Sequence, residues 1–151
     1  MQFKNVVIQS LAAVDAPCEM SSADIGDQLR PATDRLGLRQ GLIEEISGIK
    51  TRRFWNNGTQ PSDAATMAAE KAIAEADIDR NKIGVLINTS VCRDYLEPST
   101  ACLVHGNLGL HERCLNFDIG NACLAFLNGM DVAARMIERG EVDYAWGVDA
   151  E

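Results

Sequence analysis

Strand-like and helix-like segments alternate along most of this chain of 151 residues, and this order limits the folds it can adopt. Apolar runs predict strands and residues in helical spacing predict helices, in the order strand 3–11, helix 21–37, helix 62–76, strand 83–87, helix 99–108, strand 114–119, helix 121–139 and strand 142–148. This order predicts an α/β fold with a mostly parallel sheet and right-handed crossovers. Such sheets carry their functional groups beyond the carboxyl ends of the strands, so we expect a site there.

Capping residues set the expected helix ends. Ser21 or Ser22 should begin the first helix, which we expect to continue through Pro31, and Ser62 should cap the alanine-rich helix. Residues 38–61 are expected to form a loop with short helical pieces. The helix over 121–139 is apolar all round in its first half, which predicts a helix buried in the middle of the molecule.

Cys123 is the candidate nucleophile. It follows the strand-like run 115–119 and the break at Gly120, which places it at or near the first turn of the last helix. The unpaired N–H groups and the positive dipole end of a helix favour a thiolate, the reactive form of cysteine. The alternative is a packing role, because free cysteine is often buried. We assign that packing role to the other four cysteines, which are Cys18, Cys92, Cys102 and Cys114.

Composition excludes several classes of function. Fourteen basic and twenty-two acidic residues give a net charge of −8, and the largest basic cluster is Arg52-Arg53, so nucleic-acid binding is not expected. We expect no transmembrane segment. Five cysteines, an odd number without a C-x-x-C pair, indicate free thiols and a cytoplasmic location. Cys102 and His105 are two ligands without others nearby, so no metal site is expected.

Two motifs give a resemblance to a known family. The run Phe117–Phe126 contains Asn-Ala-Cys, and Leu96-Glu97-Pro98-Ser99-Thr100 precedes it, with 26 positions from Glu97 to Cys123. Together with Ile87-Asn88-Thr89-Ser90, these motifs resemble the ketoacyl synthase III group of the thiolase superfamily. The similarity is greatest to the OleA-type acyl-CoA condensing enzymes of long-chain olefin biosynthesis, and it runs over the whole chain.

The resemblance implies both an architecture and a reaction. Residues 1–151 would form the amino-terminal, nucleophile-bearing half of a five-layered fold built from two similar α/β halves, in a homodimer. Cys123 would take an acyl group from acyl-CoA or an acyl carrier protein, with no permanently bound cofactor. Glu97 would act as the base in the partner subunit's site, although a lone glutamate before proline is more often simply solvated. The product would be a β-ketoacyl compound, formed by head-to-head Claisen condensation of two fatty acyl-CoAs.

The chain departs from the family pattern at two points. The second half, with its catalytic His and Asn, is missing, and neither His105 nor His111 lies in a matching segment, so the chain by itself is expected to be inactive. Family members that initiate fatty-acid synthesis hold the coenzyme A adenine with a Trp and an Arg. Leu42 and Ile46 stand at those positions, before Ser47-Gly48-Ile49, which favours the OleA type and leaves the coenzyme A contacts unassigned.

Three alternatives stay open. The first is a 3-oxoacyl-ACP synthase III that uses a malonyl acceptor in fatty acid or polyketide synthesis. The second is a non-catalytic half or partner subunit; the short length favours it, and the presence of both Cys123 and Glu97 counts against it. The third is a redox domain with a reactive thiol, which the lack of a resolving cysteine near Cys123 disfavours. The sequence sets neither the acyl chain length nor whether the condensation is decarboxylative.

Overall fold

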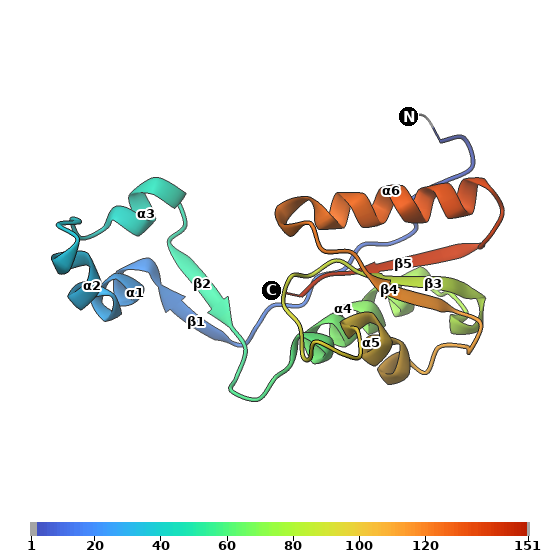
Figure 1. Cartoon of the computed structure of the whole chain (residues 1–151), viewed down its shortest axis with the longest axis horizontal. Helices are drawn as coiled ribbons and strands as arrows, with labels where there is room; N and C mark the ends of the chain where they lie inside the picture. The colour runs from blue at the N-terminus through green and yellow to red at the C-terminus, as the bar shows by residue number, and fades with distance from the viewer. Residues whose placement is uncertain (1–2, 151) are drawn as a thin grey trace. The chain divides into compact units, whose positions relative to one another are not determined.

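The structure, a computed structural model, describes residues 3–150 and divides into two compact units. The smaller unit is Asp15–Thr59, and the larger unit consists of the residues before Asp15 together with those from Gln60 onward. Both units are drawn in Figure 1, and each is described here by itself.

The larger unit is built on a three-stranded parallel sheet. Strand β3 (Ile83–Asn88) lies in the centre, between β4 (Leu115–Asp118) and β5 (Tyr144–Val148). All three strands were predicted from their apolar or alternating runs, and both strand pairs are parallel, as the α/β prediction required. Side chains of β3 are almost entirely buried, because helices cover the sheet on both faces.

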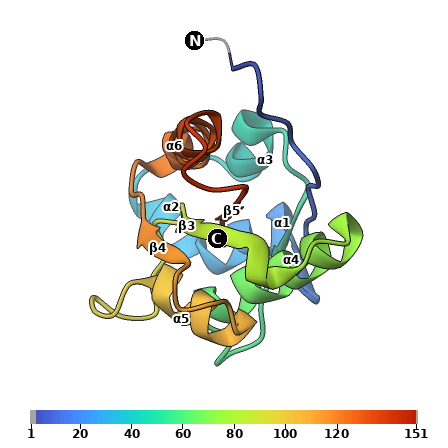
Figure 2. The ribbon, with the colours of Figure 1, turned by 90° about the vertical axis from the view of Figure 1, so that its right-hand side faces the viewer.

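Three helices cover this sheet. Helices α4 (Pro61–Ala76) and α5 (Thr100–Leu108) lie on one face, and α6 (Ala125–Glu138) lies on the other (Figures 1 and 2). Helix α6 approaches β3 closely at Gly129, where a Cβ atom would lie 2.6 Å from Cγ2 of Thr89. Two 3-10 turns, η1 (Arg80–Lys82) and η2 (Ala122–Leu124), precede β3 and α6.

The prediction that the last helix is buried on every side holds for one face only. Buried positions of α6 are Ala125, Gly129 and Ala134, which form the side toward β3 and β5. Leu124 just before the helix and Leu127 within it are 57% and 59% exposed. A sheet can cover only one side of a helix, so the other apolar side chains stay in contact with water.

The strand predicted over residues 3–11 is wrong, since this segment is extended but pairs with no strand among the described residues. The N–H groups of Lys4 and Asn5 donate to the Glu138 carboxylate at 3.1 and 2.9 Å, and the Ser10 hydroxyl donates to the Ala72 carbonyl at 2.9 Å. Its main-chain donors therefore bind a side chain at the end of α6 instead of a neighbouring strand.

The predicted helix over 21–37 is two helices. Ser21 caps α1 (Ser22–Gln28) as predicted, and its hydroxyl accepts from the Asp24 N–H at 3.0 Å. The helix ends at Gln28, and Pro31 lies in the first turn of α2 (Arg30–Arg35). Proline has no N–H to donate, so it fits the start of a new helix better than the interior of a continuous one.

The rest of the smaller unit contains an antiparallel strand pair that the sequence did not reveal. Strand β1 (Cys18–Ser21) pairs with β2 (Thr51–Phe54), and α3 (Leu42–Ser47) is one of the short helical pieces predicted for 38–61. Each strand has only four residues, and Glu19 lies opposite Arg53. Such short, charged segments lack the apolar alternation by which strands are recognised.

Candidate active site

The carboxyl ends of the three parallel strands meet at one edge of the sheet. Asn88 is level with Asp118 on one side and with Val148 on the other. The segments that follow are joined by hydrogen bonds: the Ile119 N–H donates to the Asn88 carbonyl at 2.8 Å, and the Thr89 hydroxyl donates to the Val148 carbonyl at 2.9 Å. Hydrogen bonds therefore hold together the segments after β3, β4 and β5 at the edge where a site was expected.

Cys123 lies in the turn that leaves this edge and enters α6. It is the middle residue of η2, two positions before the first residue of α6, and its side chain is exposed. This placement agrees with the prediction of a thiol at or near a helix start. The positive end of the α6 dipole acts on this turn and favours negative charge there.

The backbone beside Cys123 is strained. Ala122 has φ of +44°, in the left-handed region that residues with a Cβ atom rarely adopt. The Asn121 side-chain amide donates to the side-chain oxygen Oδ1 of Asn128 at 2.7 Å, which ties the turn to α6. Strain of this kind collects at functional sites, where the surrounding structure holds a reactive group in place. An exposed sulfur held in this way can attack an electrophilic carbon that approaches from solvent.

Glu97 lies on the loop between β3 and α5, and its side chain is exposed. Within residues 3–150 no hydrogen bond or ion pair joins Glu97 to Cys123. The two predicted site residues thus lie on the loops that follow β3 and β4, without a hydrogen bond between them. Their catalytic roles stay predictions.

Two carboxylates that hold the Glu97 loop were missed at the sequence level. Asp94 accepts from the Ser62 hydroxyl at 2.8 Å and from the Ser62 N–H at 3.3 Å. Asp118 accepts from the N–H groups of Thr100 at 3.1 Å and Ala101 at 2.8 Å. No local motif announces either contact, because the partners are 32 and 17 or 18 positions apart.

Ser62 is therefore not the cap that the sequence predicted. Helix α4 begins one residue earlier, at Pro61, and the Gln60 N–H before it donates to the Asp63 carboxylate at 3.0 Å. Ser62 is buried in the first turn and bound by Asp94. Ser99, in contrast, caps α5, because its hydroxyl accepts from the Cys102 N–H at 3.2 Å.

The remaining cysteines divide into one buried and three exposed thiols. Cys114 is buried, as its packing role predicts, and burial raises the pKa of its thiol. Cys18, Cys92 and Cys102 are exposed, so the packing interpretation is wrong for them. Their segments lie at the surface: β1 is exposed at Cys18, Cys92 lies in a loop, and Cys102 lies on the outer side of α5.

Within residues 3–150, no group of three or more His, Cys, Asp and Glu side chains is placed to hold a metal ion. A ring nitrogen of His105 lies 3.2 Å from the His111 carbonyl oxygen, so this histidine has a structural partner. None of the described helices is both long and apolar enough to span a membrane.

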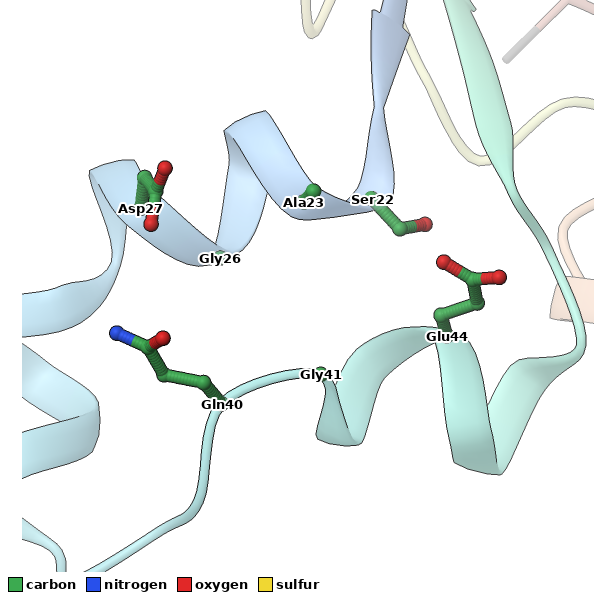
Figure 3. A pocket seen from close by; sticks show the side chains of 7 residues that line it. All are labelled: Ser22, Ala23, Gly26, Asp27, Gln40, Gly41 and Glu44. Carbon is green, nitrogen blue, oxygen red and sulfur yellow. The ribbon is translucent and has the colours of Figure 1, made fainter.

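The smaller unit has a pocket of its own, of about 120 Å³ (Figure 3). Helices α1 and α3 and the chain before α3 line it with the side chains or backbone of Ser22, Ala23, Gly26, Asp27, Gln40, Gly41 and Glu44. Two carboxylates, those of Asp27 and Glu44, are part of this lining. Neither Cys123 nor Glu97 belongs to it.

Comparison with known proteins places the chain in a family. An acyl-CoA:acyl-CoA alkyltransferase of Xanthomonas campestris is 56% identical over all 151 residues, which are 45% of that protein. A crystal structure of Xanthomonas campestris OleA with bound lauric acid and lauroyl-CoA has a TM-score of 0.92 at 55% identity, covering 99% of this chain and 44% of that one. The 3-oxoacyl-(acyl carrier protein) synthase III, FabH, of Xanthomonas oryzae has a TM-score of 0.92 at 56% identity, with the same two shares covered.

These matches agree with the parallel sheet and the helices that cover it. No family model matches the chain. The chain belongs to the OleA- and FabH-like branch of the thiolase superfamily and has a thiolase-like α/β fold. It corresponds to the amino-terminal portion of these proteins and spans about half the length of the curated relatives it matches.

Proposed function

We propose that this chain carries the nucleophile of an acyl-thioester condensing enzyme that joins two fatty acyl-CoAs head to head. The observation that carries the proposal is the exposed Cys123 in a strained turn at the start of α6, in a chain 56% identical to an acyl-CoA:acyl-CoA alkyltransferase. A catalytic His and Asn would come from the portion that the relatives have beyond this match.

In the first step, the Cys123 sulfur attacks the thioester carbonyl carbon of an acyl-CoA. A tetrahedral oxyanion forms, which N–H groups near the start of α6 are suited to stabilise. The carbon–sulfur bond to coenzyme A then breaks, and the coenzyme A thiolate takes up the proton that Cys123 released. One thioester replaces another, so the step costs little free energy, and the acyl group is held in place for the second step.

In the second step, a second acyl-CoA loses an α-proton to the Glu97 carboxylate of a partner subunit. The resulting carbanion attacks the carbonyl carbon of the acyl-Cys123 intermediate, and a carbon–carbon bond forms. The Cys123 thiolate then leaves, which releases a β-ketoacyl-CoA and restores the nucleophile. A carboxylate is strong enough for this proton abstraction only in a site that excludes water.

Studies of the relative support both residue assignments. Solved variants of Xanthomonas campestris OleA replace one glutamate and one cysteine, and these two positions are 26 apart in its sequence, the same separation as Glu97 and Cys123. The cysteine variant was solved with lauric acid and lauroyl-CoA bound. These correspondences support an acyl-CoA substrate for the proposed site.

The test requires the whole fold, so the chain would be joined to the carboxyl-terminal portion of the Xanthomonas campestris relative. After treatment with an acyl-CoA, intact-protein mass spectrometry should show one acyl adduct, which Cys123→Ala removes and Cys102→Ala retains. Glu97→Gln should keep the adduct and lose the condensation product. An adduct that survives Cys123→Ala would refute the nucleophile.

A second candidate, condensation with a malonyl acceptor, has its own support in the match to the FabH of Xanthomonas oryzae. The same joined protein separates the two reactions. Release of carbon dioxide with malonyl-ACP as acceptor, and no product from acyl-CoA alone, would favour the second candidate. A non-catalytic partner subunit would instead leave the activity of its complex unchanged by Cys123→Ala.

A further inference from the structure

The four residues that end the loop between β3 and α5 project from the larger unit. Tyr95 and Leu96 are 60% and 86% exposed, and Glu97 and Pro98 are exposed as well. We call Tyr95–Pro98 the loop tip. An exposed segment without secondary structure of its own is normally mobile, because few contacts oppose its motion. A base that must reach another site needs the opposite property, a fixed direction.

The first anchor of the loop tip is Asp94, the residue directly before it. Its carboxylate binds both the hydroxyl and the N–H of Ser62, in the first turn of α4. Ser62 is buried at 6% exposure, so the anchor point belongs to the core of the larger unit. Hydrogen bonds to a carboxylate are stronger than those between neutral groups.

The second anchor lies one residue beyond Ser99, on the other side of the loop tip. The Asp118 carboxylate binds the N–H groups of Thr100 and Ala101, which begin α5. Asp118 is also the last residue of β4, five positions before Cys123, and the next N–H, that of Ile119, is bound by the Asn88 carbonyl. One carboxylate thus ties the end of the Glu97 loop to the strand that leads to Cys123.

We propose that Asp94 and Asp118 are positioning residues that hold the loop tip, and with it Glu97, in a fixed direction. This inference rests on the proposed function in one respect only, the role of Glu97 as a base. The two carboxylates act through the loop and touch no reacting atom. Each binds N–H groups in the first turn of a helix, where negative charge is favoured, so both ends of the tip are held by helices packed on the sheet.

Loop mobility can be measured on the chain as it is, without substrate. Chymotrypsin cuts after Tyr95 only when the loop tip can enter its active site. Asp94→Ala and Asp118→Asn should speed this cut about ten-fold, since each loses hydrogen bonds to a charged group. Ser62→Ala removes only the hydrogen bond from the Ser62 hydroxyl to Asp94, so it should increase the cutting rate less.

Asp63→Ala is the matched control. This substitution also removes a carboxylate at the start of α4, the one that accepts from the Gln60 N–H. It leaves the hydrogen bonds of Asp94 and Asp118 intact. Its cutting rate should equal that of the unaltered chain. Equal rates in the Asp94 and Asp118 variants and the unaltered chain, or equal acceleration by Asp63→Ala, would overturn the proposal.

A second readout separates positioning from general stability. In the joined protein described above, Asp94→Ala should lower kcat for condensation and leave acylation of Cys123 at its original rate, and Asp94→Glu should recover part of kcat. A loss of both steps would mean a structural role and would overturn the proposal. If Glu97→Gln leaves condensation intact, the proposed base is wrong, and the cutting rates still decide the anchors.

Discussion

Two polar side chains at the carboxyl edge of the sheet are buried without hydrogen-bond partners in the described part of the chain. These are the Asn88 amide, which is fully buried, and the Thr100 hydroxyl, whose residue is 1% exposed. A buried polar group without a partner costs about 1–3 kcal/mol of stability. Both residues adjoin the anchors of the Glu97 loop, so this edge is held together at some cost in free energy.

Thr100→Val should leave the free energy of unfolding unchanged or raise it by about 1 kcal/mol, because valine has the same shape without the unpaired hydroxyl. Urea denaturation at one fixed chain concentration would measure the effect. Thr66→Val is the control: the Thr66 hydroxyl donates to the Ser62 carbonyl at 2.6 Å and accepts from Asn107 at 3.2 Å, so its loss should destabilise. A clear loss of stability in Thr100→Val would show that its hydroxyl has a partner.

Cys114 gives a prediction about pH. Burial raises the pKa of its thiol in the folded chain, so the folded state favours the neutral form. The unfolded chain ionises this thiol near the ordinary value of about 8.5. Stability from Cys114 is therefore complete below that pH and is lost as the pH rises through the higher folded pKa. Between neutral and alkaline pH, the free energy of unfolding should decrease less in Cys114→Ala than in the unaltered chain. Equal decreases in the two proteins would contradict the prediction.

At the scale of elements, α6 packs closely at Gly129 against β3 and the residue that follows it. A Cβ atom on Gly129 would lie 2.6 Å from Cγ2 of Thr89 and 3.6 Å from Cγ2 of Ile87. Gly129→Ala should therefore destabilise by about 1–3 kcal/mol through overpacking, in spite of the better helix propensity of alanine.

Two variants test this explanation by urea denaturation. Thr89→Ser removes the clashing methyl group, so Gly129→Ala should cost less in that background than in the unaltered chain. Gly106→Ala in α5 is the control, because a Cβ there meets nothing within 4 Å, and the change should stabilise by up to about 1 kcal/mol. Equal effects of the two glycine substitutions would contradict close packing at Gly129.

Elements with strong local signals were predictable from the sequence. The apolar run of β3, the cap Ser21 and the helix expected over 99–108 each depend on neighbouring residues, and the structure confirms them. The segment 3–11 has the apolar pattern of a strand, but a strand also needs a partner, which the pattern does not show. Prediction from sequence missed the β1–β2 pair for the opposite reason, since its short charged strands carry almost no apolar pattern.

The candidate site likewise contains residues that have a local sequence signal and residues that have none. Cys123 could be found because its setting, a strand followed by a glycine and a helix start, is written in consecutive residues. Asp94 and Asp118 could not, because their partners are brought to them only by folding. Contacts between distant residues decide how the candidate site is held, and a single sequence contains no local sign of them.

At the scale of the whole molecule, the exposed apolar side of α6 should promote association between chains. Leu124, Leu127 and Met130 are 57%, 59% and 37% exposed at spacings of three along this segment. Exposed apolar patches promote association. We expect the chain alone to self-associate, and sedimentation at several concentrations should show a rising mass.

Replacing Leu124 and Leu127 with lysine should shift the population toward monomer, because charged side chains oppose burial of this face. Leu36→Lys is the control, since Leu36 is somewhat more exposed than Leu124 and Leu127, at 65%, but lies in the smaller unit. It should leave the association unchanged. A monodisperse, cooperatively folding monomer of the unaltered chain would refute the expectation.

The extended segment at the start of the larger unit has a consequence for the way the chain reaches its native state. Lys4 and Asn5 bind Glu138, more than 130 positions later, and Ser10 binds Ala72, 62 positions later. On the ribosome, residues 3–10 emerge before α4 and α6, so the groups they bind have still to be made. These residues can therefore dock only after the chain as far as α6 has been synthesised, so their hydrogen bonds to Glu138 form late in folding.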